Sequence, residues 1–189
     1  QRGPMLLCVD TSGSMQGAPE AVAKAVVLEV MRVAHQERRG CRLIAFGGPG
    51  ELAEHQLDLG PEGLAAVLAL MGQSFDGGTD LQTPIARAIE LVHEARWAAA
   101  DLLIVSDGAF GCTAATLDQL DRARERFGLR VQGILVGDRE TLGLLEVCDD
   151  IFWLRDWRRF ESDTPQPHGF VPVHTAGLTA LYFPNALSE

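Results

Sequence analysis

The chain has 189 residues, of which 47% are apolar, and it carries a formal net charge of −10 at pH 7. This length and composition suffice for one buried core, so we expect a single domain with at most a short appendage. The acidic balance argues against nucleic acid or an anionic membrane as a partner, because their phosphate charges would repel the protein. The sequence has no run of about 18 apolar residues, the length needed to span a bilayer.

The cysteines and the composition bear on the compartment. Cys8, Cys41, Cys112 and Cys148 are widely spaced and form no C-x-x-C pair, which favours buried free thiols in a reducing cytosol. The only asparagine, Asn185, is not followed by the x-Ser/Thr that N-glycosylation requires. A single lysine among many arginines suggests a GC-rich genome. We therefore predict a bacterial, cytoplasmic protein.

Short apolar runs that end in polar or glycine residues alternate with segments of helical spacing. In chain order the predicted elements are strand 5–9, helix 19–37, strand 41–46, edge strand 54–59, helix 61–70, helix 81–96, strand 102–105, helix 114–127, strand 131–136, helix 140–148 and strand 151–154. Pro19, Pro61 and Pro84 lie near helix starts, where a missing N–H costs nothing.

This alternation predicts the fold class and the domain limits. A parallel neighbour is reached through a right-handed crossover helix, so we expect helices on both faces of a mostly parallel sheet. The predicted fold is α/β and doubly wound, with 54–59 as one antiparallel edge strand. The periodicity stops after about Phe160. We therefore assign residues 1–160 to one domain and 161–189 to a tail, either docked or flexible.

Three polar clusters lie at strand ends or before a helix, and open α/β sheets bind ligands beyond the carboxyl ends of their strands. The first is the D-x-S-x-S run Asp10-Thr11-Ser12-Gly13-Ser14, directly after the first strand. The second, Asp76-Gly77-Gly78-Thr79-Asp80, precedes the helix at 81–96. The third, Ser106-Asp107-Gly108, follows the strand at 102–105.

The residue types in these clusters indicate a hard metal ion. Carboxylate and hydroxyl oxygens suit Mg²⁺ or Mn²⁺, whereas Zn²⁺ and Cu²⁺ favour His or Cys, and no histidine lies in the clusters. Asp10, Ser12, Ser14, Thr79 and Asp107 can fill part of a Mg²⁺ shell, directly or through water, and leave one position open. Each cluster alone is more often a turn or a helix cap, so the prediction rests on their joint occurrence.

This set of five residues resembles the metal-ion-dependent adhesion site of von Willebrand factor A domains. Asp10, Ser12 and Ser14 match its first loop, Thr79 its second and Asp107 its third, and the resemblance covers roughly residues 5 to 157. It implies a Mg²⁺ ion whose open position takes an Asp or Glu carboxylate from a protein partner. We therefore interpret the chain as a metal-dependent protein-binding module and not as an enzyme.

A narrower resemblance concerns the partner. The run from Cys8 to Met15, the early GGTDL, Val105-Ser106-Asp107 and the late Phe152-Trp153 with Asp156-Trp157-Arg158-Arg159 look like the C-terminal domain of ViaA-type proteins. Those intracellular bacterial proteins work with a MoxR-type AAA+ ATPase. The resemblance implies such an ATPase as the partner.

Three further residues are candidates around the site. Asp76 and Asp80 flank Thr79 and can hold metal-bound waters, although Asp80 is equally suited to cap the helix that starts at Leu81. Trp157 is the best surface candidate for partner binding, because aromatic side chains dominate interface hot spots.

Two alternative functions follow from the same residues. A Mg²⁺-dependent hydrolase or phosphotransferase would use Asp10 as the nucleophile, but it would want a second aspartate where Ser12 stands and a lysine other than Lys24. An extracellular adhesion domain would keep the metal site, but the free cysteines and the missing glycosylation signal weigh against it. A nucleotide-binding fold is excluded because no glycine-rich phosphate loop follows a strand.

Overall fold

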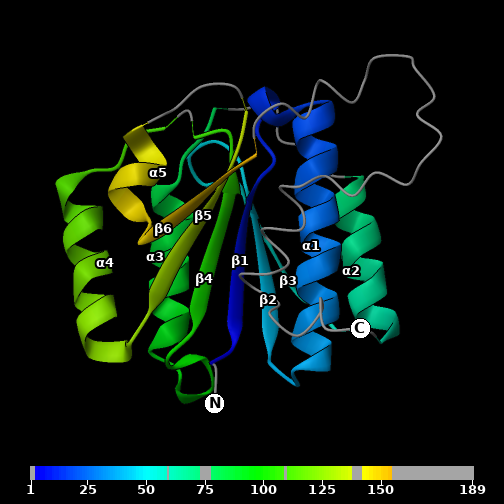
Figure 1. The fold of residues 1–189 in the computed structure, drawn as a ribbon, viewed down its shortest axis with the longest axis horizontal. Coiled ribbons are helices and arrows are strands. Elements are labelled where there is room, and N and C mark those ends of the chain that lie inside the picture. The colour runs from blue at the N-terminus through cyan, green and yellow to red at the C-terminus, as the bar shows by residue number, and fades with distance from the viewer. Residues whose placement is uncertain (1–2, 59, 73–77, 109, 138–141, 155–189) are drawn as a thin grey trace.

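The computed structural model describes residues 3–58, 60–72, 78–108, 110–137 and 142–154 (Figure 1). In chain order the elements are β1 (Met5–Asp10), η1 (Gly13–Met15), α1 (Ala18–Gln36), β2 (Cys41–Phe46), β3 (Leu52–Gln56), α2 (Pro61–Met71), α3 (Gln82–Val92), η2 (Ala95–Trp97), β4 (Asp101–Ser106), α4 (Ala114–Phe127), β5 (Arg130–Val136), α5 (Leu142–Val147) and β6 (Asp150–Leu154). Within these ranges, no helix has the length and apolar character needed to cross a membrane.

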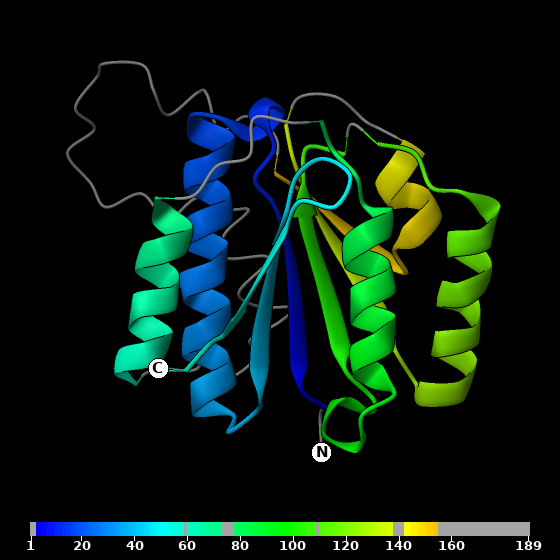
Figure 2. The same cartoon turned by 180° about the vertical axis from the view of Figure 1, so that it is seen from behind.

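The described strands form one six-stranded sheet in the order β3-β2-β1-β4-β5-β6. All neighbours are parallel except β2 and β3, which are antiparallel. Helices α1 and α2 cover one face, and α3, α4 and α5 cover the other (Figures 1 and 2). The predicted doubly wound α/β fold with one antiparallel edge strand is therefore confirmed. The strand order reverses beside β1, the position at which open α/β sheets bind ligands beyond the carboxyl ends of their strands.

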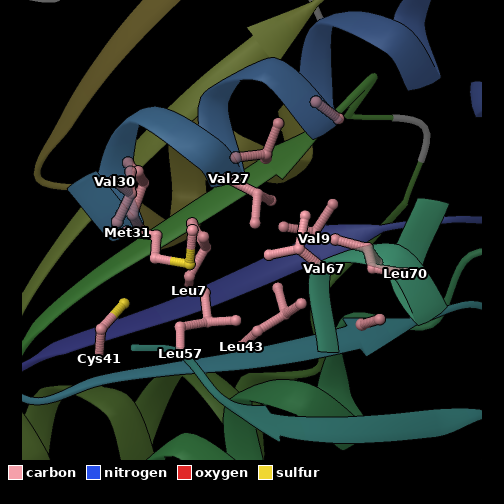
Figure 3. Packing of buried hydrophobic residues seen from close by; sticks show 14 of the residues in the cluster. Leu7, Val9, Val27, Val30, Met31, Cys41, Leu43, Leu57, Val67 and Leu70 are labelled. Atoms are coloured by element: carbon pink, nitrogen blue, oxygen red, sulfur yellow. The ribbon is translucent and has the colours of Figure 1, made fainter. Parts of the chain in front are cut away.

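Strand β1 is packed by apolar side chains on both faces of the sheet. Leu7 and Val9 pack with α1 and α2, while Leu6 and Cys8 pack into the cluster beneath α3 and α4, and all four are almost fully buried. Figure 3 shows Leu7 and Val9 facing apolar side chains of α1 such as Val27. Because both faces of β1 are packed, the residue at its carboxyl end, Asp10, has a defined position.

Two predicted boundaries were wrong. Helix α3 ends at Val92 and not at residue 96, because the bond from His93 N to Glu90 O (3.3 Å) replaces the α-helical pattern. The chain then turns through η2, which buries Trp97 in the core. The edge strand spans Leu52–Gln56 and not 54–59, because the tight turn before it already pairs Phe46 with Leu52.

The four cysteines are free, as predicted, but only two of them are fully buried. Cys8 and Cys41 have no exposed surface, whereas Cys112 and Cys148 are half-buried. Burial raises the pKa of the Cys41 thiol to about 12 and that of Cys112 to about 11, and in Cys112 the nearby carboxylates of Glu146 and Asp80 add to the effect. These thiols are therefore protonated at neutral pH.

Candidate metal centre

The first and third clusters meet because β1 and β4 are neighbours. The register places Val9 opposite Val105, so Asp10 and Ser106 end up side by side at the carboxyl ends of the two strands. The loop that carries Thr79 reaches the same end of the sheet, where Asp80 N donates to Gly47 O at 2.7 Å, just beyond β2. Residues from three distant parts of the sequence therefore share one site.

Three hydroxyl groups converge at this site. Ser12 Oγ lies 3.0 Å from Ser14 Oγ and 2.9 Å from Thr79 Oγ1, although Thr79 is 67 residues away in the sequence. Ser12 is buried, Thr79 is half-buried and Ser14 is exposed. The cluster thus extends from the protein interior to the surface.

Asp10 lies beneath the hydroxyl groups with no exposed surface. Its Oδ1 accepts from Ser12 N at 2.9 Å, and its Oδ2 accepts from Ser106 Oγ at 2.6 Å. Burial raises the pKa of Asp10 above its ordinary value, and the negative charge of Asp107 raises it further, while the hydrogen bonds from Ser106 and Ser12 lower it. Within the described residues no cationic side chain pairs with Asp10, so two neighbouring carboxylates share an acidic site.

Ser106 is a site residue that the sequence reasoning did not select. It is fully buried, and besides donating to Asp10 its Oγ accepts from Gly108 N at 3.0 Å. Gly108 has φ of 76°, a left-handed conformation that favours glycine. The position of Ser106 at the end of a buried strand was visible in the sequence, but the contact of Ser106 with Asp10 depends on the pairing of β1 with β4.

Thr11 and Asp80 hold the two outer loops in place. Thr11 donates to Phe46 O through its backbone N at 2.9 Å and through Oγ1 at 3.1 Å, which ties the first loop to β2. The carboxylate of Asp80 accepts from Gln82 N at 3.1 Å and from Thr83 Oγ1 at 2.5 Å. Asp80 therefore bonds the first turn of α3, but Leu81 and not Asp80 occupies the N-cap position, and the water-holding role of Asp80 stays a prediction. Asp76, Trp157 and the boundary at residue 160 with the tail lie outside the described residues.

The donor set fits a hard divalent cation. It consists of two carboxylates and three hydroxyl groups, the oxygen ligands that Mg²⁺ and Mn²⁺ prefer. Among the described residues, no group of three or more His, Cys, Asp or Glu side chains is arranged to hold a metal, so hydroxyl groups make up most of this donor set. A cation would also offset the negative charge of Asp10, for which the described residues provide no cationic partner.

Comparisons with known proteins agree with this fold. A family model described as "von Willebrand factor type A domain" matches residues 5–109. Among solved structures, a von Willebrand factor type A protein from Catenulispora acidiphila has a TM-score of 0.64 at 17% identity, over 82% of this chain and 39% of that one. The pilus adhesin SpaC from Lactobacillus rhamnosus GG has a TM-score of 0.55 at 15% identity, over 72% of this chain and 24% of the adhesin.

A third structure is that of an aerotolerance-related membrane protein from Bacteroides fragilis with multiple mutations to serines. Its TM-score is 0.55 at 16% identity, over 70% of this chain and 66% of that one. At these identities the matches establish the fold. The chain spans about a quarter of the adhesin and about two fifths of the Catenulispora protein.

Proposed function

Because the chain belongs to the von Willebrand factor type A domain family, we propose that it is a protein-binding module built around a Mg²⁺ or Mn²⁺ ion. Domains of this family commonly mediate protein–protein interactions. In this proposal the metal is held, directly or through water, by Asp10, Ser12, Ser14, Thr79 and Asp107. The observation that carries the proposal is the convergence of three hydroxyl groups, from two separate loops, above the buried carboxylate of Asp10.

In this proposal some residues of the site orient the metal ligands, and others leave the metal accessible to a partner. Asp10 is held by Ser12 N and Ser106 Oγ, so its carboxylate is oriented before any ligand arrives. Ser14 is exposed, which leaves the outer side of the cluster open to a partner. The bound ion would supply the positive charge that attracts an Asp or Glu carboxylate from that partner.

The arrangement around Asp10 favours binding over catalysis. Ser12, whose backbone N–H donates to Asp10, stands where a hydrolase or phosphotransferase of this kind would need a second aspartate. Lys24, which a phosphotransferase would place against a phosphate, forms an ion pair with Glu20 one turn away on α1. We therefore propose a non-catalytic module, and expect no turnover of generic phosphatase substrates with Mg²⁺.

The proposed partner is a MoxR-type AAA+ ATPase in the bacterial cytoplasm, as the likeness to ViaA-type proteins implies. The free, buried thiols of Cys8 and Cys41 support a reducing compartment over the surface location of an adhesin. In the same proposal, residues 1–160 form the binding domain, and Trp157 near its end contacts the partner.

The direct test is calorimetric titration of Mg²⁺ into the metal-free protein. Thr79→Ala removes a proposed ligand from a half-buried position, and it should weaken Mg²⁺ binding at least about tenfold. Thr113→Ala removes the hydroxyl that caps α4, so it should cost about 1 kcal/mol of stability but leave Mg²⁺ affinity unchanged.

Binding of the ATPase should require the metal and should fall in parallel in Thr79→Ala. The proposal would be refuted if neither Asp10→Ala nor Thr79→Ala changed metal binding. It would also be refuted if the wild type bound no Mg²⁺ at millimolar concentrations.

A further inference from the structure

A pocket lies at the opposite end of the sheet from the candidate metal centre. It has a volume of about 470 Å³ and is lined by residues 3–4, residues 37–40 and Arg96. These segments precede β1, β2 and β4, so the pocket lies at the amino ends of the three central strands. Figures 1 and 2 show the α1–β2 connection and η2 at this end. The volume is in the range of pockets that hold small ligands.

The pocket has a structured base. The guanidinium of Arg39 donates to Gly3 O and to Asp101, and also to Glu37 at 3.1 Å, and its side chain is only 7% exposed. Asp101 also forms an ion pair with Arg130. Arg39 is therefore fully engaged in tying its own segment to Gly3 and to Asp101 at the start of β4, and is not a free ligand for a solute.

Two other arginines have unused donors. Within the described residues the exposed guanidinium of Arg38 forms no ion pair or hydrogen bond. Arg96 uses its Nε for Glu94 at 2.9 Å, and its guanidinium lies over the Trp97 ring at 5.8 Å from the centroid. Its terminal nitrogens have no hydrogen-bond acceptor in the described part of the chain. Arg39 and Arg96 thus have acidic partners, whereas Arg38 has none among the described residues, in a protein of net charge −10.

The backbone conformation of Arg38 suggests that its side chain has a role. Arg38 follows the end of α1 with φ of 54°, a left-handed conformation in which glycine is the favoured residue. A side chain at such a position costs free energy, and this cost is typically found where the residue has a role. Compensation of the negative end of α1 is one such role, and binding of an anion is the other.

We propose that this pocket is an oxyanion-binding site in which Arg38 and Arg96 recognise a carboxylate or a phosphate group. Arginine is suited to both groups because its planar fork of N–H donors matches two oxygens at once. The site is independent of the metal centre, since it lies at the other end of the sheet and uses different residues.

The test is an NMR titration of the ¹⁵N-labelled protein with inorganic phosphate and, separately, with tetraglutamate, in metal-free buffer without a chelator, so that neither a metal nor a competing carboxylate is present. Saturable shifts are expected at the backbone amides of residues 37–40. Arg38→Gln should weaken binding about tenfold, as expected for the loss of a charge-assisted hydrogen bond. Arg122→Gln removes the same charge from an exposed position on α4 and should change the affinity less than twofold.

Arg38→Gly separates anion binding from helix capping. Glycine suits the positive φ, so this variant should fold at least as stably as Arg38→Gln while binding the anion equally weakly. Tighter binding of phosphate or of tetraglutamate identifies the source of the oxyanion, and either result supports the site. Unchanged affinity in both Arg38 variants, or an equal loss in Arg122→Gln, overturns the proposal. Neither result depends on the outcome of the Mg²⁺ titration.

Discussion

Ser106→Ala tests how the candidate metal centre is held together. The substitution deletes a 2.6 Å hydrogen bond to the buried Asp10 carboxylate, a charge-assisted contact worth about 1.5–3 kcal/mol. It also leaves Gly108 N without its acceptor, which costs about 1–3 kcal/mol if no water replaces the hydroxyl group. Because a water can enter at the end of a strand, we expect a loss near the lower end of the sum, about 3 kcal/mol.

The assay is urea and thermal unfolding of the metal-free protein. A loss of this size corresponds to a melting temperature roughly 6–12 °C lower for a domain of this length. The effect should shrink as the pH falls and Asp10 becomes protonated, because the deleted hydrogen bond is strongest with the ionised carboxylate.

Ser14→Ala is the matched control for Ser106→Ala. Ser14 is exposed, so its hydroxyl can exchange Ser12 for water, and the variant should lie within about 0.5 kcal/mol of the wild type. The reasoning would be wrong if Ser106→Ala were as stable as Ser14→Ala. It would also be wrong if the loss in Ser106→Ala were the same at neutral and acidic pH.

Three further predictions concern other buried or constrained groups. Burial raises the pKa of Asp10 in the folded protein above its ordinary value of 3.8. The contribution of Asp10 to the free energy of unfolding is therefore highest below pH 3.8, where Asp10 is protonated, and it falls as the pH rises through the raised pKa and the buried group becomes charged. Metal-free Asp10→Asn should therefore be more stable than the metal-free wild type at pH 7 but not near pH 3. The measurement is the urea midpoint of both proteins at the two pH values, and an equal difference in midpoint at both would contradict the prediction. Ala99 has φ of 54°, so Ala99→Gly should gain about 0.5–1 kcal/mol in urea unfolding, and a loss would refute the argument from strain. Cys8 and Cys41 are fully buried thiols, so peptide mapping by mass spectrometry should find them alkylated by iodoacetamide only after unfolding; complete labelling in the native state would refute this.

The two ends of the sheet carry different charged residues. The carboxyl ends gather Asp10 and Asp107, which suits a cation, while the amino ends gather Arg38, Arg39 and Arg96. The central strands separate the two groups of charges, so the proposed metal centre and the proposed anion site would be independent of each other. A protein with an acidic net charge can therefore still present an exposed guanidinium, that of Arg38, at a pocket.

The order of the elements was predictable because it depends on local pattern. Short apolar runs marked β1, β2, β4, β5 and β6, and the helical spacing between them required crossovers on both faces of a parallel sheet. The placement of Asp10, Ser12 and Ser14 directly after β1 was equally local, since the D-x-S-x-S run continues a recognisable strand.

Tertiary structure alone decided which groups meet. The contact of Ser12 with Thr79 joins residues 67 positions apart, and the bond from Ser106 to Asp10 depends on the register of β1 against β4. The end of α3 at Val92 and the burial of Trp97 are likewise not revealed by the helical periodicity around them. Periodicity encodes which face of an element is buried, whereas strand register and loop packing depend on contacts between segments far apart in the chain.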